Sequence, residues 1–125
     1  MATGYTAVVC RATGCGRGNA GTVAAQLFTA LQDAVRASPQ GVLVSTGCLL
    51  GRSACAGRAV APVVLVQACD ADRAPVGTAV RVGPLRTAAD VATVADWLRA
   101  GDLDARLLPA QLLGVHRQVA AAPLN

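Results

Sequence analysis

Lysine and glutamate are both absent from this chain of 125 residues, so all eleven basic residues are arginine and all seven acidic residues are aspartate. The aspartates are scattered over expected loops and helix ends, and the one histidine, His116, is far in sequence from any candidate nucleophile. No general acid–base pair can be assembled from these residues. The sequence therefore argues against a hydrolytic enzyme, and we expect His116 to be a surface residue.

Aromatic residues are also scarce, at 2% of the chain: Tyr5, Phe28 and Trp97. They form no platform on which nucleic-acid bases could stack, and the arginines that give a net charge of +4 are spread along the sequence rather than gathered in one stripe. We therefore expect no nucleic-acid partner. Trp97 is interpreted as a rim residue that packs one face on the core.

Long apolar runs are missing as well: no stretch approaches the roughly 20 residues that span a bilayer. The first residues carry neither a basic region nor an apolar signal core. These absences predict a cytoplasmic protein without a membrane partner. A chain of this length can bury a sufficient core without disulfides, so its five cysteines suggest free thiols, metal ligation or redox chemistry.

Two apolar, strand-like runs flank a segment with helical spacing. The runs are Tyr5–Val9 and Val42–Thr46, and the helix is predicted over Thr22–Ala37 with Thr22 as its N-cap. A strand–helix–strand crossover is right-handed and makes its strands parallel, so both exit loops should leave the same edge of the sheet. The almost wholly apolar second run predicts a central strand covered on both faces.

The second half of the chain predicts a hairpin and another helix. Strands are expected at Pro62–Gln67 and Thr78–Val82, joined by a polar reversal, and the Thr87–Asp90 capping box opens a helix that ends at Gly101. The order β-α-β-β-β-α predicts an α/β fold, a mixed four-stranded sheet with helices packed on it, in the minimal thioredoxin-like arrangement. We expect one domain over residues 1–104. Residues 105–125 would form a short helix and a tail, and the leucines expected in that helix are Leu107, Leu108, Leu112 and Leu113.

Four of the five cysteines follow the first two strands. Cys10 and Cys15 come directly after the first run, and Cys48 and Cys55 come after the second. If the strands are parallel, four thiols can face one small space, as an iron–sulfur cluster or a structural zinc requires. The fifth, Cys69, should fall at the far edge of the sheet, and we interpret it as a buried or half-buried structural thiol.

The cysteine segments resemble the thioredoxin-like [2Fe–2S] ferredoxins. The resemblance covers about residues 5–100 and depends on Val9-Cys10-Arg11-Ala12-Thr13-Gly14-Cys15-Gly16, on Val44-Ser45-Thr46-Gly47-Cys48 through Cys55, and on Pro62-Val63-Val64-Leu65-Val66. It implies an electron carrier that holds one [2Fe–2S] cluster, serves a redox protein partner, and has as ligands Cys10, Cys15, Cys48 and Cys55. Four residues separate the first cysteine pair and six the second, which differs from the family's usual spacing. Pro62 stands where this fold commonly places a cis-proline.

Three other functions stay open from the residues alone. A cluster-free thioredoxin-like interaction module, with a second copy of the chain as a candidate partner, would keep the fold and leave the cysteines unused. The same four cysteines could hold a structural zinc, although only the first pair has the spacing of a tight zinc knuckle. A thiol–disulfide oxidoreductase is disfavoured because no Cys-x-x-Cys opens a helix.

Overall fold

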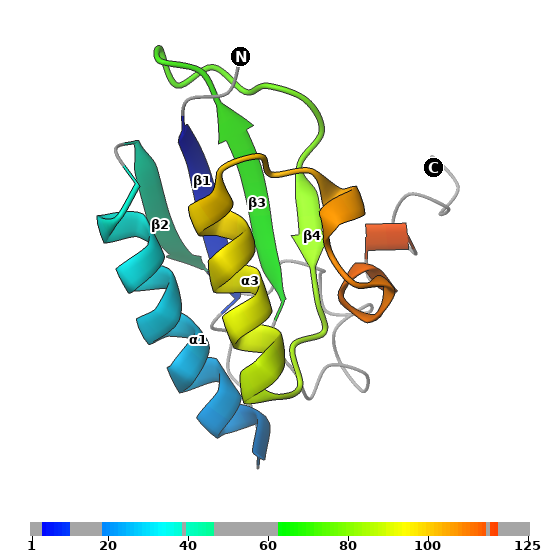
Figure 1. Ribbon diagram of the computed structural model, residues 1–125. Helices are drawn as coiled ribbons and strands as arrows, with labels where there is room; N and C mark the ends of the chain where they lie inside the picture. Colours follow the sequence, from blue (N-terminus) through cyan, green and yellow to red (C-terminus); the bar gives the residue numbers. More distant parts are fainter. Residues whose placement is uncertain (1–3, 11–18, 39, 47–62, 115, 118–125) are drawn as a thin grey trace.

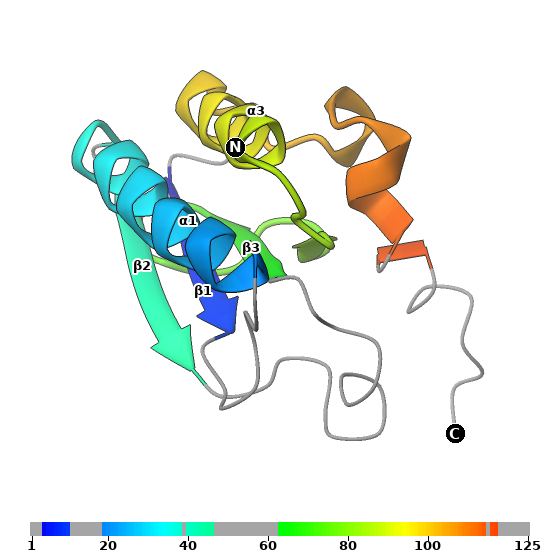
Figure 2. The same cartoon turned by 90° about the horizontal axis from the view of Figure 1, so that it is seen from below.

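The structure is a computed structural model that describes residues 4–10, 19–38, 40–46, 63–114, 116 and 117. It is an α/β fold in which a mixed four-stranded sheet carries helices on one face (Figures 1 and 2). The strands and α-helices are, in chain order, β1 (Gly4–Cys10), α1 (Asn19–Arg36), β2 (Gly41–Thr46), β3 (Val64–Cys69), β4 (Val80–Val82) and α3 (Ala88–Ala100).

The sheet has the strand order β2-β1-β3-β4. β1 and β2 are parallel, whereas β3 is antiparallel to both of its neighbours, β1 and β4. The predicted parallel pair and the predicted hairpin of the third and fourth strands are therefore confirmed. Both strands of the hairpin are displaced from the predicted bounds, because β3 begins two residues later, at Val64, and β4 begins at Val80.

The prediction that the second strand is central in the sheet is wrong. β3 pairs with the side of β1 that β2 does not use, so β2 lies at the edge of the described sheet. Val42 and Val44 consequently each keep 41% of their surface exposed. Leu43, between them, is half-buried and packs against the core.

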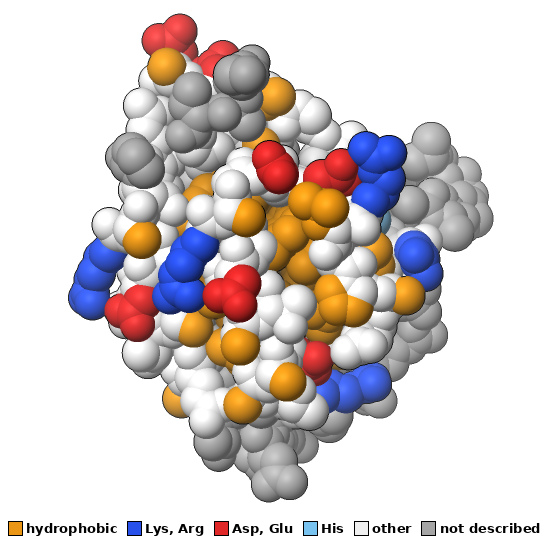
Figure 3. Space-filling view, in the orientation of Figure 1, with side chains coloured by type: hydrophobic (Ala, Val, Ile, Leu, Met, Phe, Trp, Pro, Cys, Tyr) orange, Lys and Arg blue, Asp and Glu red, His pale blue; other side chains and the backbone are white. Residues whose placement is uncertain are grey.

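The core lies between the sheet and the pair α1 and α3, which lie side by side on the same face (Figure 2). Leu27 and Leu31 are fully buried at the helical spacing read from the sequence, but α1 begins at Asn19, so Thr22 lies within the helix and is not its N-cap. The outer surface of the helices mixes arginine and aspartate side chains (Figure 3). Among the described residues, no helix has both the length and the apolar character needed to cross a membrane.

Helix α3 has the boundaries that its sequence predicts. The Thr87 side chain accepts a hydrogen bond from the Asp90 backbone N–H at 3.1 Å, and the Asp90 carboxylate accepts one from the Thr87 backbone N–H at 3.2 Å, which completes the capping box. At the other end Gly101 has a φ of 84°, in the left-handed region that favours glycine. The predicted buried face of the helix is confirmed by Val91, Val94, Ala95 and Leu98.

The segment after α3 returns to the same core. It forms two short 3₁₀ helices, η1 (Ala105–Leu107) and η2 (Ala110–Leu113), where the sequence predicted a single short helix. Of its leucines, Leu107 is 59% exposed, whereas Leu108, Leu112 and Leu113 are buried. A backbone hydrogen bond of 2.8 Å from the N–H of Gly83 to the carbonyl of Leu112 ties η2 to the end of β4.

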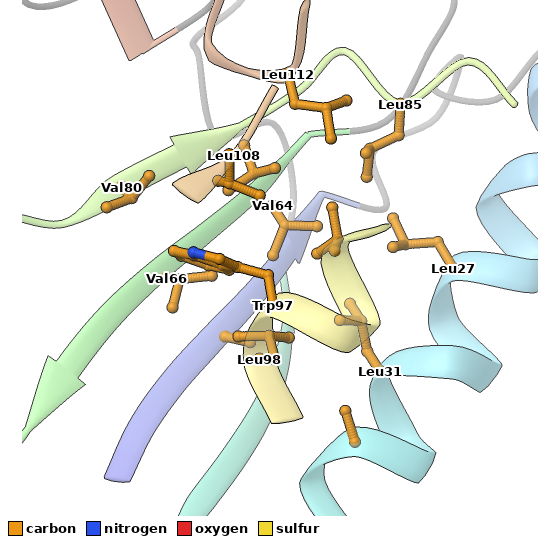
Figure 4. Close-up of a cluster of buried hydrophobic side chains, with 14 of the residues drawn as sticks. Leu27, Leu31, Val64, Val66, Val80, Leu85, Trp97, Leu98, Leu108 and Leu112 are labelled. Atoms are coloured by element: carbon orange, nitrogen blue, oxygen red, sulfur yellow. The ribbon is translucent and has the colours of Figure 1, made fainter. Parts of the chain in front are cut away.

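Trp97 is a core residue, which corrects its interpretation as a rim residue. Its side chain is 6% exposed and lies among Val66, Leu98 and Leu108 (Figure 4). The indole N–H donates a hydrogen bond of 2.9 Å to the carbonyl oxygen of Asp104. The chain around Asp104, just before η1, therefore covers the part of the Trp97 side chain that was expected to lie outside the core.

Candidate functional site

The carboxyl ends of β1 and β2 meet at one edge of the sheet. The two strands are in register over their whole shared length, from Tyr5 opposite Gly41 to Cys10 opposite Thr46. Neighbouring strands lie about 4.8 Å apart, so the backbone of Cys10 is directly beside the last residue of β2. The sequence predicted that these two strand ends converge, and this is confirmed.

Cys10 is the one predicted ligand whose backbone the structure describes. Thr46 precedes Cys48 by two residues in the sequence. The other three predicted ligands, Cys15, Cys48 and Cys55, lie outside the described residues, and so does Pro62, the expected cis-proline. Within the described part of the chain, the cis peptide bond joins Gly83 to Pro84.

The register that places Cys10 beside Thr46 is set at the opposite ends of the strands. The backbone N–H of Tyr5 donates to the carbonyl of Gln40 at 3.2 Å, and the Tyr5 hydroxyl lies 3.2 Å from the Ser38 hydroxyl. A Cβ on Gly4 would collide with the backbone of Gln40, so glycine permits the close approach of β1 to the turn before β2. A slip of one residue would break all of these contacts.

Arg73, which sequence reasoning missed, reinforces this end of the sheet from the β3–β4 loop. Its guanidinium donates to the Gln40 carbonyl at 2.7 Å and to the Thr6 hydroxyl at 2.8 Å. The residue has a φ of 66°, and the Asp70 carboxylate accepts hydrogen bonds from two backbone N–H groups of the same turn. The only sequence signal was the polar reversal itself; nothing local indicated that its arginine reaches back to the first two strands.

Cys69 is separated from the predicted ligands by the length of the sheet. It pairs with Gly4, at the end of β1 opposite to Cys10, and six strand residues of about 3.3 Å each place the two backbones about 20 Å apart. Its side chain is 4% exposed, and its sulfur lies 4.0 Å from the Thr6 hydroxyl. The prediction of a buried thiol at the far edge is confirmed.

A cavity of about 320 Å³ lies between β3, β4 and the segment after α3, and is lined in part by Val66, Val80, Asp102 and His116. His116 is half-buried, whereas the sequence predicted a surface position, and its Nδ1 accepts a hydrogen bond of 3.4 Å from the Arg81 backbone N–H. The neighbouring Asp104 is already paired with Arg106 at 2.9 Å. In the described part of the chain no carboxylate is hydrogen-bonded to His116, so the cavity offers no assembled acid–base pair.

The ion pair between Asp104 and Arg106 shifts the pKa of both side chains. Hydrogen bonds from the Arg106 side chain and backbone lower the pKa of the Asp104 carboxyl, and the same carboxylate raises the pKa of Arg106. Among the residues that the structure describes, no three His, Cys, Asp or Glu side chains come together as a metal site would need. The candidate site is the strand edge at Cys10 and Thr46, because each of the two strands that end there leads into one of the cysteine pairs.

Comparison with known proteins found no match: no protein-family model, no curated protein and no solved structure matches the chain.

Proposed function

We propose that this protein binds a [2Fe–2S] cluster through Cys10, Cys15, Cys48 and Cys55 and carries electrons to and from a redox partner protein. The observation that supports the proposal is the pairing of Cys10 with Thr46 at the shared edge of two parallel strands. Each of the two strands leads into one of the cysteine pairs. The topology therefore brings the starting points of both cysteine-bearing segments together.

The short stretch of chain after β2 limits the distance between Cys48, the first cysteine of the second pair, and Cys10 in the first pair. Two residues of extended chain span at most about 7 Å, so Cys48 follows within that distance of Thr46. Thr46 itself lies about 4.8 Å from Cys10 across the strand pair. No large rearrangement of the sheet is needed for one thiolate of each pair to reach a common cluster.

The donor set also fits the cofactor. Four cysteine thiolates are the usual ligands of a [2Fe–2S] cluster, which supplies one-electron chemistry when it is bound. The role of the chain is to hold those thiolates, and the clamp of Gly4, Tyr5 and Arg73 on Gln40 keeps their strands in register. Cys69, about 20 Å away along β1, is left out of the set.

The same proposal includes a thioredoxin-like fold. In that arrangement the third strand is antiparallel to the other three, and here β3 is antiparallel to β1 and β4 while β1 and β2 are parallel. The sheet order and the position of α1 and α3 on one face are compatible with it (Figure 2).

The test is anaerobic purification followed by an absorption spectrum from the near ultraviolet to the red, with iron, sulfide and zinc quantified on the same sample. We expect broad visible bands and about two irons and two inorganic sulfides per chain. Changing any one of the four proposed ligands to serine should abolish or strongly weaken the bands. Cys69→Ala is the matched control, because it removes a cysteine from the opposite edge and should leave the spectrum unchanged.

Two results would contradict the proposal. A colourless protein with one zinc per chain, lost on serine substitution of the same cysteines, would assign them to a structural zinc site. A colourless protein without metal, even after attempted cluster reconstitution, would favour a cluster-free interaction module.

A further inference from the structure

We propose that two copies of this chain associate through the edge strand β2, which pairs antiparallel with its symmetry mate and joins the two four-stranded sheets into one. The inference concerns the outer edge of β2, the strand that also leads into the second cysteine pair, but it does not depend on the proposed cluster.

Strand β2 has the properties of an open pairing edge. Within the described part of the chain it pairs only with β1, so its outer row of backbone N–H and C=O groups faces away from the sheet. It lacks three of the devices by which proteins protect such edges, since its sequence Gly41–Thr46 carries no charge and no proline, and its register with β1 has no bulge. Val42 and Val44 leave 41% of their side chains exposed beside this edge.

The other edge of the sheet provides a comparison within the same molecule. Strand β4 has only three residues, one of them Arg81, and its end is tied to η2 by the bond from Gly83 to Leu112. A short, charged and partly covered edge resists pairing with another chain. Among the described residues, the β4 edge is protected in three ways and the β2 edge in none of these, so the β2 edge is the one available to a partner.

The sequence of β2 favours a second copy as that partner. Val42-Leu43-Val44 reads the same in both directions, so an antiparallel pair with its two-fold axis at Leu43 places Val42 of each copy opposite Val44 of the other. Both valines lie on the face that is left exposed, while Leu43 packs into its own core. The valines of the two copies then contact each other as β-branched cross-strand pairs, which stabilise antiparallel sheets.

The distribution of charged residues also favours a second copy of the chain as the partner. The chain carries a net charge of +4, which opposes self-association at most surfaces. No charged residue occurs between Arg36 and Arg52, a stretch that includes the whole of β2. Two copies can therefore meet along this strand without placing like charges opposite each other.

The test is the oligomeric state, measured by sedimentation under reducing conditions over a hundredfold range of protein concentration. We expect a dimer that dissociates on dilution. The double variant V42K/V44K places a lysine opposite a lysine at both pairs and should weaken the dimer at least about tenfold. The matched control A92K/Q111K adds the same charge at exposed positions on α3 and η2 and should leave the dissociation constant unchanged.

Hydrogen exchange locates the interface. The amides of Gly41–Thr46 should become better protected as the concentration rises, whereas those of β4 should not. Circular dichroism verifies that the lysine variant is folded, and the single variant Val44→Lys replaces it if it is not, with a smaller expected loss. A chain that is monomeric at every concentration, a dimer that V42K/V44K leaves intact, or a dimer without added protection in β2 would each overturn the proposal. Binding of a foreign peptide strand by a monomeric chain would assign the edge to another partner.

Discussion

Replacement of Leu112 by alanine tests whether the C-terminal segment is part of the core. Leu112 is completely buried next to Leu85 (Figure 4), and its side chain comes from η2, which follows α3 in the chain. Truncation of a fully buried leucine to alanine costs about 2–5 kcal/mol, from lost transfer free energy and from the cavity left behind. The bond from Gly83 to the Leu112 carbonyl involves backbone only, so the substitution leaves it in place.

A loss of that size is a large part of the roughly 5–15 kcal/mol that stabilises a domain. The measurement is urea unfolding followed by the fluorescence of Trp97, the only tryptophan, which is buried in the same core. With a urea dependence of about 2 kcal/mol per molar, the midpoint should fall by roughly 1–2.5 M without a change in slope.

Leu107→Ala is the matched control, since it is the same substitution five residues earlier at a side chain that is 59% exposed. It should change the free energy of unfolding by no more than about 0.5 kcal/mol. If both alanine variants unfold at the midpoint of the parent chain, the C-terminal segment contributes nothing to the core, and our account of its packing is refuted.

Three further predictions concern single residues near α3. Thr87→Ala removes the N-cap of the capping box with Asp90 and should lower the free energy of unfolding by about 1 kcal/mol, whereas Thr87→Ser should retain most of it; equal stability of the two would refute the cap. Gly101→Ala forces a side chain into a left-handed conformation and should cost about 1 kcal/mol in urea unfolding, although no atom lies within 4 Å of the added carbon. Arg106 depresses the pKa of Asp104, so the stabilising effect of this carboxylate is present above its unfolded value of about 3.9 and is lost as the pH falls through the lower folded value. The stability difference between the parent and Asp104→Asn should therefore be seen at neutral pH and vanish in acid; a difference independent of pH would contradict this.

The parts of the fold that the sequence predicted best depend on neighbouring residues. The start of α3 follows from Thr87 and Asp90, three residues apart, whose side chains and backbones bond each other reciprocally. Its end follows from Gly101, because a left-handed residue after the last turn favours glycine. Where the local capping signal is weaker, the predicted helix boundary was wrong: α1 begins at Asn19, whereas the sequence predicted its N-cap at Thr22.

Packing against distant residues could not be predicted in the same way. The apolar run of β2 was expected in the centre of the sheet, but an apolar run reports only its own composition and not which strands lie on its two sides. Trp97 was expected at the rim, and it is buried because the chain around Asp104, seven residues later, folds back over it. Arg73 reaches Gln40 and Thr6 from a loop that the sequence identified only as a reversal.

The same difference between local sequence and long-range packing applies to the candidate site. The sequence by itself determined that each of the first two strands leads into a cysteine pair, and the handedness of the crossover was enough to predict that these strands are parallel. Only the tertiary structure decided that Cys10 stands opposite Thr46 and that β2 lies at the sheet edge. The physical reason is that register and strand order are set by contacts among residues far apart in the chain, here Gly4 and Arg73 against Gln40, which no local pattern contains.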